Sequence, residues 1–282
     1  MGIVVNTNVS SILVQRSLGS ATGEISKSLE KLSTGFKINR AADDAAGLVI
    51  SESLRSQARG AAQASANAQT GVNLLQTAEA DLGIVQENLQ RIRDLTVQAA
   101  NGTNGTTERT AIYSEVSART QEIDRIAKSS AFNAIKLLDG TSTSLVLQIG
   151  SNSAASLNSL SIGSTLGKST SSVLGLGTTT EVSTAFATAT AASSFISRID
   201  AAISTVSTRR SQIGSLQNRL DSAIKSLAIK QENMLSADSR IRDTDVAKES
   251  ATLTKNQILQ QASASLLAQA NQSPQIALSL LQ

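Results

Sequence analysis

The sequence contains no cysteine, no histidine and no tryptophan, and its aromatic side chains are four Phe and one Tyr. Without cysteine or histidine the chain cannot form a disulfide framework, a Cys/His zinc site or a haem ligand of the usual kind. The same absence excludes Ser-His-Asp and Cys-His nucleophilic pairs. We therefore expect no enzyme activity, no catalytic or metal site and no cofactor.

Proline occurs once, and aromatic residues make up only 2% of the 282 residues. A globular core of that size usually relies on Phe, Tyr and Trp for buried area, so Ala, Leu, Ile and Val must supply the packing here. Small aliphatic side chains fill narrow seams between helices, and long helices exclude proline. The composition favours a mainly α-helical, elongated bundle over a compact enzyme.

An excess of charge of one sign is also lacking, because 25 Lys and Arg residues face 22 Asp and Glu residues. This balance, with so few aromatic side chains to stack on bases, argues against nucleic acid or a membrane as a partner. No apolar run approaches the ~18 residues of a membrane span. Residues 1–5 meet polar side chains before a signal-peptide core can form, so we expect a soluble chain without a cleavable signal.

Helical periodicity occupies both ends of the sequence, over residues 1 to about 140 and about 195 to 282. The region between them carries only two charged side chains among many Ser, Thr and Gly residues. A β-like run at residues 145–149 ends at a glycine. We predict a small β-hairpin region with a polar loop over about 140–195.

A heptad pattern indicates one long helix from about residue 44 to residue 100. Upstream, the same register holds Ala61, Ala64, Ala68 and Gly71, whose small size would let a neighbouring helix approach closely. The seam positions, spaced alternately by three and four residues, are Leu75, Ala78, Leu82, Val85, Leu89, Ile92, Thr96 and Ala99.

Two more helices are expected to pack against this one. The turn at residues 101–105 precedes a helix that Thr106 or Thr107 could cap, which gives an antiparallel hairpin. Its two Asn-Gly-Thr segments match the N-glycosylation pattern, to which we assign no role. A second heptad stripe, from Ile199 to Met234, predicts a helix long enough to lie along residues 44–100, although Arg210, Gln217 and Gln231 interrupt it.

The two ends of the chain are predicted to be matching amphipathic helices, the second ending at Ser273-Pro274. Breaks at residues 35–43 and 238–244 separate them from the central helices. Neither can bury its stripe alone, so they should pair with each other and with other subunits. The stripes contain Ile25, Leu29 and Leu32 in the first helix, and Leu259, Ala262 and Leu266 in the last.

This pattern divides the chain into two predicted domains. Residues 1–42 with 240–282 form a terminal coiled-coil domain, and residues 43–239 form a central helical bundle that includes the hairpin region.

Two short motifs suggest ligand chemistry but fit simpler interpretations. The segment Gly163–Ser169 resembles a phosphate-binding loop, yet it has three residues between its glycines where four are needed, and no convincing helix follows. The pairs Asp43-Asp44 and Asp243/Asp245 stand at expected helix starts, where carboxylates act as caps. We interpret the first as a loop and the second as capping.

Several longer motifs resemble, in order, those of bacterial flagellins. They are KLSTGFKINRAADDAAG at residues 31–47, LQRIRDL at 89–95, Phe132-Asn133, QILQQA at 257–262 and LAQANQ at 267–272. The chain is therefore identified as a member of this family, in a short form, since residues 140–195 leave room for a hairpin and a loop but not for large outer domains.

The resemblance implies a secreted, extracellular structural protein that self-assembles into the helical polymer of the flagellar filament for motility. Its terminal helices would pair as a coiled coil at the filament core, with polymerisation contacts from Ile25, Leu29, Leu32, Leu259 and Leu266. The implied partners are further copies of the chain, a flagellar export chaperone, and the cap and hook-junction proteins.

The resemblance also implies that Toll-like receptor 5 of animal hosts recognises the monomer through the central helix. In the filament the same face would be buried between subunits. The matching residues are Leu89, Gln90, Arg91, Ile92, Leu95 and Gln98, with Glu115 on the adjacent helix. Asp94 and Ile92 stand where family members often have Glu and Val, and both changes are mild.

Two other functions remain open at this point. A hook-filament junction protein would share the terminal helices but form only a short adapter, and the density of filament-type motifs argues against it. A secreted coiled-coil ligand or adhesin would have similar helices without polymerising. The hypothesis of an enzyme would be supported only by the incomplete glycine loop.

Overall fold

The computed structural model describes residues 7–142, 144–152 and 158–279, with backbone alone from residue 273 onward. The chain divides into two compact units. The terminal unit comprises Met1–Gln57 and Glu232–Gln282, and the central unit comprises Ala58–Gln231. Helices α2 (Ala45–Ala100) and α6 (Ala189–Arg242) each contribute residues to both units.

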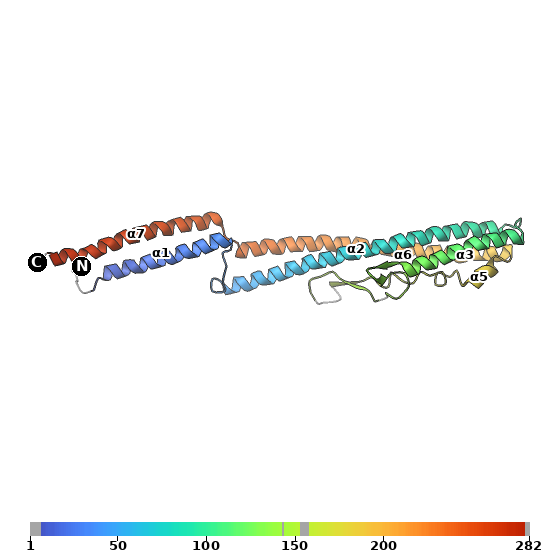
Figure 1. Cartoon of the computed structure of the whole chain (residues 1–282), viewed down its shortest axis with the longest axis horizontal. Helices are drawn as coiled ribbons and strands as arrows, with labels where there is room; N and C mark the ends of the chain where they lie inside the picture. The colour runs from blue at the N-terminus through green and yellow to red at the C-terminus, as the bar shows by residue number, and fades with distance from the viewer. Residues whose placement is uncertain (1–6, 143, 153–157, 280–282) are drawn as a thin grey trace. The chain divides into compact units, whose positions relative to one another are not determined.

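In the terminal unit, α1 (Val9–Thr34) and α7 (Val246–Ser279) lie side by side and antiparallel (Figure 1). Asn8 begins α1, because its side-chain oxygen accepts a hydrogen bond from the N–H of Ser11 at 3.1 Å. Gly35 ends the helix with φ +76°, a conformation that glycine adopts without strain, while its N–H donates to the Lys31 carbonyl.

The expected end of α7 at Ser273-Pro274 is wrong, because the helix continues to Ser279. A proline inside a helix removes one N–H and disturbs one turn, but it does not prevent the following residues from keeping helical dihedral angles.

The central unit is built on α2, whose eight predicted seam residues are completely buried. Both α3 (Thr106–Ser129) and α6 pack along this seam and contribute apolar side chains to one continuous core. Upstream, Ala61 and Ala64 pack against Leu227 of α6, so the small residues do allow close helix packing.

Two of the three polar residues that interrupt the stripe of α6 have polar partners on α2. The Arg210 guanidinium donates to Gln86 Oε1 at 2.8 Å, and Gln217 Nε2 donates to Glu79 Oε2 at 3.1 Å. A buried polar group without a partner is costly, so these pairs let α6 keep its polar positions and also restrict its register against α2.

The region after α3 contains two short hairpins. Strands β1 (Ala131–Phe132) and β2 (Ile135–Lys136) are antiparallel, and the two turn residues between them have positive φ angles. Strands β3 (Val146–Gln148) and β4 (Ser159–Ser161) pair with Leu147 opposite Leu160. The mainly α fold with small antiparallel strand pairs is thus confirmed.

Gly71 of α2 lies where the second hairpin packs. A Cβ at this position would meet Cδ1 of Leu147, so glycine lets this side chain of β3 lie directly against the helix, and a larger residue would require Leu147 to move. The predicted close approach at Gly71 therefore includes a strand as well as the neighbouring α6, whose Leu220 is also close.

Two local features differ from the sequence-based expectations. The short helix α5 (Thr179–Ala185) lies in the region expected to be a polar loop, and it begins with a capping box between Thr178 and Glu181. The N–H of Thr178 donates to the Glu181 carboxylate and holds its pKa below the usual value. Helix α3 is capped by Gly105 without a side-chain hydrogen bond, so the expected Thr106 or Thr107 cap is wrong.

Replacing Leu82 by Ala should lower the free energy of unfolding of the central unit by about 2–5 kcal/mol, because the seam cannot close around the cavity. Ile84 is a matched control two residues away on α2, with 46% of its surface exposed. Its replacement by Ala should cost about 0.5 kcal/mol or less. Denaturant unfolding of both variants, followed by circular dichroism, measures the difference, and equal losses would contradict the seam as the main source of stability.

Candidate assembly and recognition surfaces

The seam between α1 and α7 combines hydrogen bonds with half-buried apolar side chains such as Leu18 and Leu253. Ser28 Oγ donates to Glu249 Oε1 at 2.6 Å, and Ser11 Oγ donates to Asn271 Oδ1 at 2.9 Å. The buried side chains of the two helices are also small or polar, namely Ser11, Ala21, Ser28, Asn256 and Ser263. Such a seam buries little apolar area, so the hydrophobic stabilisation of this pair within one chain is small.

Several of the larger apolar side chains of the same two helices are exposed. Leu29 keeps 51% of its surface accessible, Leu259 45% and Leu266 55%. Ile25 and Leu32, the other predicted polymerisation residues, are half-buried. A surface with many exposed apolar side chains is typical of one that other proteins cover.

The predicted stripes missed further exposed apolar residues on these helices. Their exposure is comparable to that of Leu266 or greater, and they are Val9, Ile12, Leu13, Val246 and Ile258. The signal was present in the sequence, because each is a large apolar residue in a helix whose fully buried positions are Ser, Ala and Asn.

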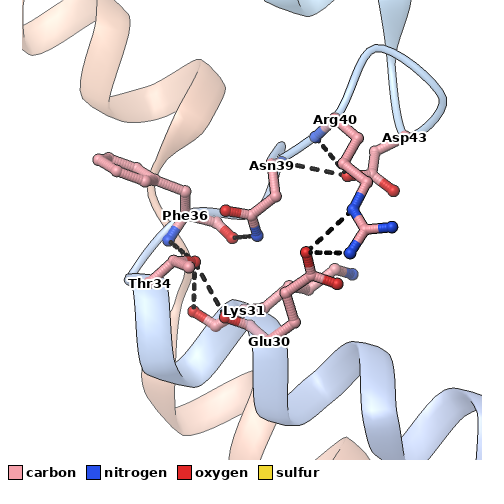
Figure 2. A network of polar contacts seen from close by, with 7 residues as sticks. All are labelled: Glu30, Lys31, Thr34, Phe36, Asn39, Arg40 and Asp43. Atoms are coloured by element: carbon pink, nitrogen blue, oxygen red, sulfur yellow. Dashed lines mark hydrogen bonds and ion pairs between the residues drawn. The ribbon is translucent and has the colours of Figure 1, made fainter.

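The connector between α1 and α2 is shaped by hydrogen bonds to Asp43 (Figure 2). The backbone N–H groups of Asn39 and Arg40 donate to Asp43 Oδ2 at 3.1 and 2.9 Å. These bonds hold the pKa of Asp43 below its usual value. The Arg40 guanidinium also forms an ion pair with Glu30 of α1, 3.0 Å between Nη2 and Oε1. The connector is therefore tied both to itself and to the end of α1.

Two of the predicted aspartates, Asp44 and Asp245, act as helix caps, whereas Asp43 binds the connector instead. Asp44 accepts a hydrogen bond from the N–H of Gly47 at 2.9 Å at the start of α2, and Asp245 accepts one from Lys248 at 3.1 Å at the start of α7. Across the part of the chain that the structure describes, no three acidic side chains come together in a way that could hold a metal ion.

Arg242, which the sequence did not single out, joins the two connectors of the terminal unit. Its guanidinium lies over the Phe36 ring, 4.7 Å from the centroid, and donates to Glu52 Oε1 at 2.9 Å. Its backbone carbonyl accepts the N–H of Lys37 at 2.6 Å. Arg242 therefore helps to join the break after α1 to the break before α7, and the N–H of Thr244 adds a hydrogen bond to the Gly35 carbonyl at 2.9 Å.

The predicted recognition residues of α2 fall into two groups that alternate along the helix. Leu89, Ile92 and Leu95 are buried in the core, whereas Gln90, Arg91 and Gln98 are exposed. The structure brings the predicted Glu115 of α3 to this surface, because Arg91 Nε lies 2.9 Å from Glu115 Oε1. The groups that another molecule could touch are thus polar and charged.

The glycine loop at residues 163–169 presents carbonyl oxygens to a cation. The Arg209 guanidinium donates to the Lys168 carbonyl at 2.7 Å and to Ser169 Oγ at 2.6 Å, and its burial lowers its pKa. A phosphate site needs the opposite arrangement, with backbone N–H groups converging at a helix start. This loop is a structural contact of α6.

Comparison with known proteins gives matches along the chain. The family model of the bacterial flagellin N-terminal helical region matches residues 5–143, and that of the C-terminal helical region matches residues 196–281. A flagellin of Halalkalibacterium halodurans is 43% identical over 279 residues, covering 99% of this chain and 100% of the relative. Flagellin FlaB1 of Treponema pallidum is 40% identical over 290 residues with the same coverage.

A solved structure of a putative flagellar hook-associated protein from Vibrio parahaemolyticus shares the fold, with a TM-score of 0.60 over 71% of this chain and 100% of that one. Its sequence identity is 16%, so it supports the fold alone. No helix in the described ranges is both long and apolar enough to span a bilayer. Because both family regions match in order and the relatives align along almost their whole length, the chain belongs to the bacterial flagellin family.

Proposed function

We propose that this chain polymerises through the exposed apolar side chains of α1 and α7. As a member of the flagellin family it is a structural subunit of the bacterial flagellar filament, an extracellular polymer. The observation that supports the proposed contact is that the paired helices leave large apolar side chains exposed, among them Leu29, Leu259 and Leu266.

Burial of these side chains can supply the driving force for assembly. Complete burial of a Leu, Ile or Val side chain contributes about 1.5–3 kcal/mol. Each subunit exposes several of them on two adjacent helices, and a second copy of the chain carries the same surface. Repetition of one modest contact along a helical polymer gives a stable structure without a strong interaction between any two free subunits.

Within this proposal, residues 1–42 and 240–282 form the filament-core domain, and residues 43–239 form the central helical bundle. The connectors at Gly35–Asp44 and Asp243–Asp245 support these boundaries, because each interrupts the helices on either side. The hairpin region at 140–195 belongs to the bundle.

Self-association is the proposed mode of action, with no catalysis and no cofactor. Its further proposed partners are an export chaperone and the cap and hook-junction proteins, on the strength of family membership. The identity of 40–43% with flagellins along the full chain favours a filament subunit over a hook-filament junction protein. The exposed apolar surface favours a polymerising subunit over a secreted ligand that stays monomeric.

Replacing both Leu259 and Leu266 by Ser should abolish filament formation, because it removes apolar contact area at the proposed interface. Both residues are exposed, so the helix content and the unfolding midpoint of the monomer should change little. Electron microscopy after seeding, with a pelleting assay on the same sample, measures the polymer. Gln261→Ser, on the exposed surface of the same helix, is the matched control and should polymerise normally.

Filaments of the double variant with unchanged yield would contradict the proposed contact. Loss of polymerisation in the Gln261→Ser control as well would show that α7 tolerates no change, and would remove the distinction between apolar and polar positions.

We also propose that Toll-like receptor 5 recognises the monomer at the α2–α3 surface. Gln90, Arg91 and Gln98 offer the exposed polar contacts, and Glu115 holds the Arg91 guanidinium in place. Leu89, Ile92 and Leu95 would act by holding this part of α2 in the core, since their side chains are buried.

Replacing Arg91 by Ala should reduce receptor signalling by the purified monomer roughly tenfold or more, the effect of losing one charged contact worth about 1.5–3 kcal/mol. Glu122→Ala on α3 is the control, because that residue pairs with Arg125 away from this surface. A reporter-cell assay measures both. Undiminished signalling by Arg91→Ala, or absence of signalling by the unaltered monomer, would contradict the proposal.

A further inference from the structure

We propose that Asn101 is a site of spontaneous deamidation, in which the backbone nitrogen of the next residue displaces the side-chain amide. The reaction is fastest when glycine follows asparagine, because glycine has no side chain to block the nitrogen and restricts the backbone least. The sequence contains two such pairs, Asn101-Gly102 and Asn104-Gly105. Both lie in the loop that joins α2 to α3 (Figure 1).

The conformation of Asn101 favours this attack. Its side chain is exposed, and its Oδ1 accepts a hydrogen bond from the N–H of Thr103 at 3.3 Å. This Asx turn brings the amide carbon toward Gly102, the residue between the two partners, and polarises the amide carbonyl. The side-chain nitrogen that must leave has no hydrogen-bond partner within the described part of the chain, and a Cβ built at Gly102 would meet no atom within 4 Å.

Asn104 has the same neighbour but is restrained. Backbone N–H groups are bonded at both sites, since that of Asn101 donates to the Gln98 carbonyl at 3.2 Å and that of Asn104 to the Asn101 carbonyl at 3.1 Å. The sites differ because the side-chain nitrogen of Asn104, the leaving group, donates to the Gln98 carbonyl, and the Asn104 carbonyl accepts a hydrogen bond from the Arg109 guanidinium. Rotation of the amide carbon of Asn104 toward the following nitrogen must break some of these bonds, which costs free energy before the reaction begins. The fold therefore distinguishes two chemically equivalent Asn-Gly pairs.

The reaction balances with water as the only co-reactant. The Gly102 nitrogen loses its proton and forms a bond to Asn101 Cγ, while the bond from Cγ to Nδ2 breaks and ammonia leaves. Water then opens the five-membered imide at either carbonyl and gives aspartate or isoaspartate. The new carboxylate follows directly after the C-terminus of α2, where the helix dipole disfavours negative charge. Isoaspartate also adds a carbon to the backbone of the loop.

The test follows the purified full-length monomer over time in mildly alkaline buffer made with heavy-oxygen water. Peptide mass mapping reports the label at each site, and an isoaspartyl methyltransferase detects the rearranged product. We expect Asn101 to react about tenfold faster than Asn104, the effect of about 1.4 kcal/mol on the barrier. In urea the two rates should converge, because unfolding removes both the hydrogen bonds that restrain Asn104 and the Asx turn at Asn101.

Two variants separate the local chemistry from the fold. Gly102→Ala should slow labelling of Asn101, whereas the matched variant Gly105→Ala should leave Asn101 unchanged. Arg109→Ala should speed labelling of Asn104 by releasing its carbonyl. Equal rates at the two sites in the folded monomer, or faster labelling of Asn104, would overturn the proposal. Labelling of Asn101 in urea but not in the folded chain would overturn it as well.

Discussion

The central unit depends on a row of small and aliphatic side chains along one face of α2, from Ala61 to Ala99. With so few aromatic residues, apolar burial must come from a long, narrow contact rather than a broad centre. The row accommodates α3, α6 and the β3–β4 hairpin, and Gly71 marks the place where a strand comes closest. The polar pairs of Arg210 and Gln217 with α2 then restrict the register in which α6 can use it.

The terminal unit is also built from long helices, but it leaves large apolar side chains exposed. Its two helices bury Ser, Ala and Asn side chains, half-bury Ile25 and Leu32, and leave Leu29, Leu259 and Leu266 exposed, so pairing within a chain leaves several large apolar side chains uncovered. Hydrogen bonds such as Ser28 to Glu249 align the helices at modest net stability. A pair of this kind is aligned before assembly, while most of its hydrophobic stabilisation becomes available only when other copies cover it.

The regular features were predictable from the sequence because they depend on periodicity. The heptad spacing located the α2 seam, and the breaks after Gly35 and before Asp245 follow from capping residues. The seam of the terminal pair was predictable only in part. Ile25 and Leu32 of the predicted stripe are half-buried, whereas Leu29, Leu259 and Leu266 are exposed and the fully buried positions include Ser11, Ser28 and Ser263. Likewise α5 forms in a Ser/Thr-rich segment, where the capping box and burial of Val182 and Phe186 outweigh weak helix propensity.

Arg242 shows why some functional residues need a structure to be found. Its ring contact, its ion pair and its backbone hydrogen bond join Phe36, Glu52 and Lys37, which are about two hundred positions away along the sequence. No local pattern marks it, because each interaction arises only after both connectors have folded. The proposed recognition surface has the same character, since Arg91 is oriented by Glu115 from another helix. On that surface the exposed polar residues alternate with buried ones, so a substitution that changes recognition can leave the seam intact, whereas one at Leu89 or Ile92 cannot.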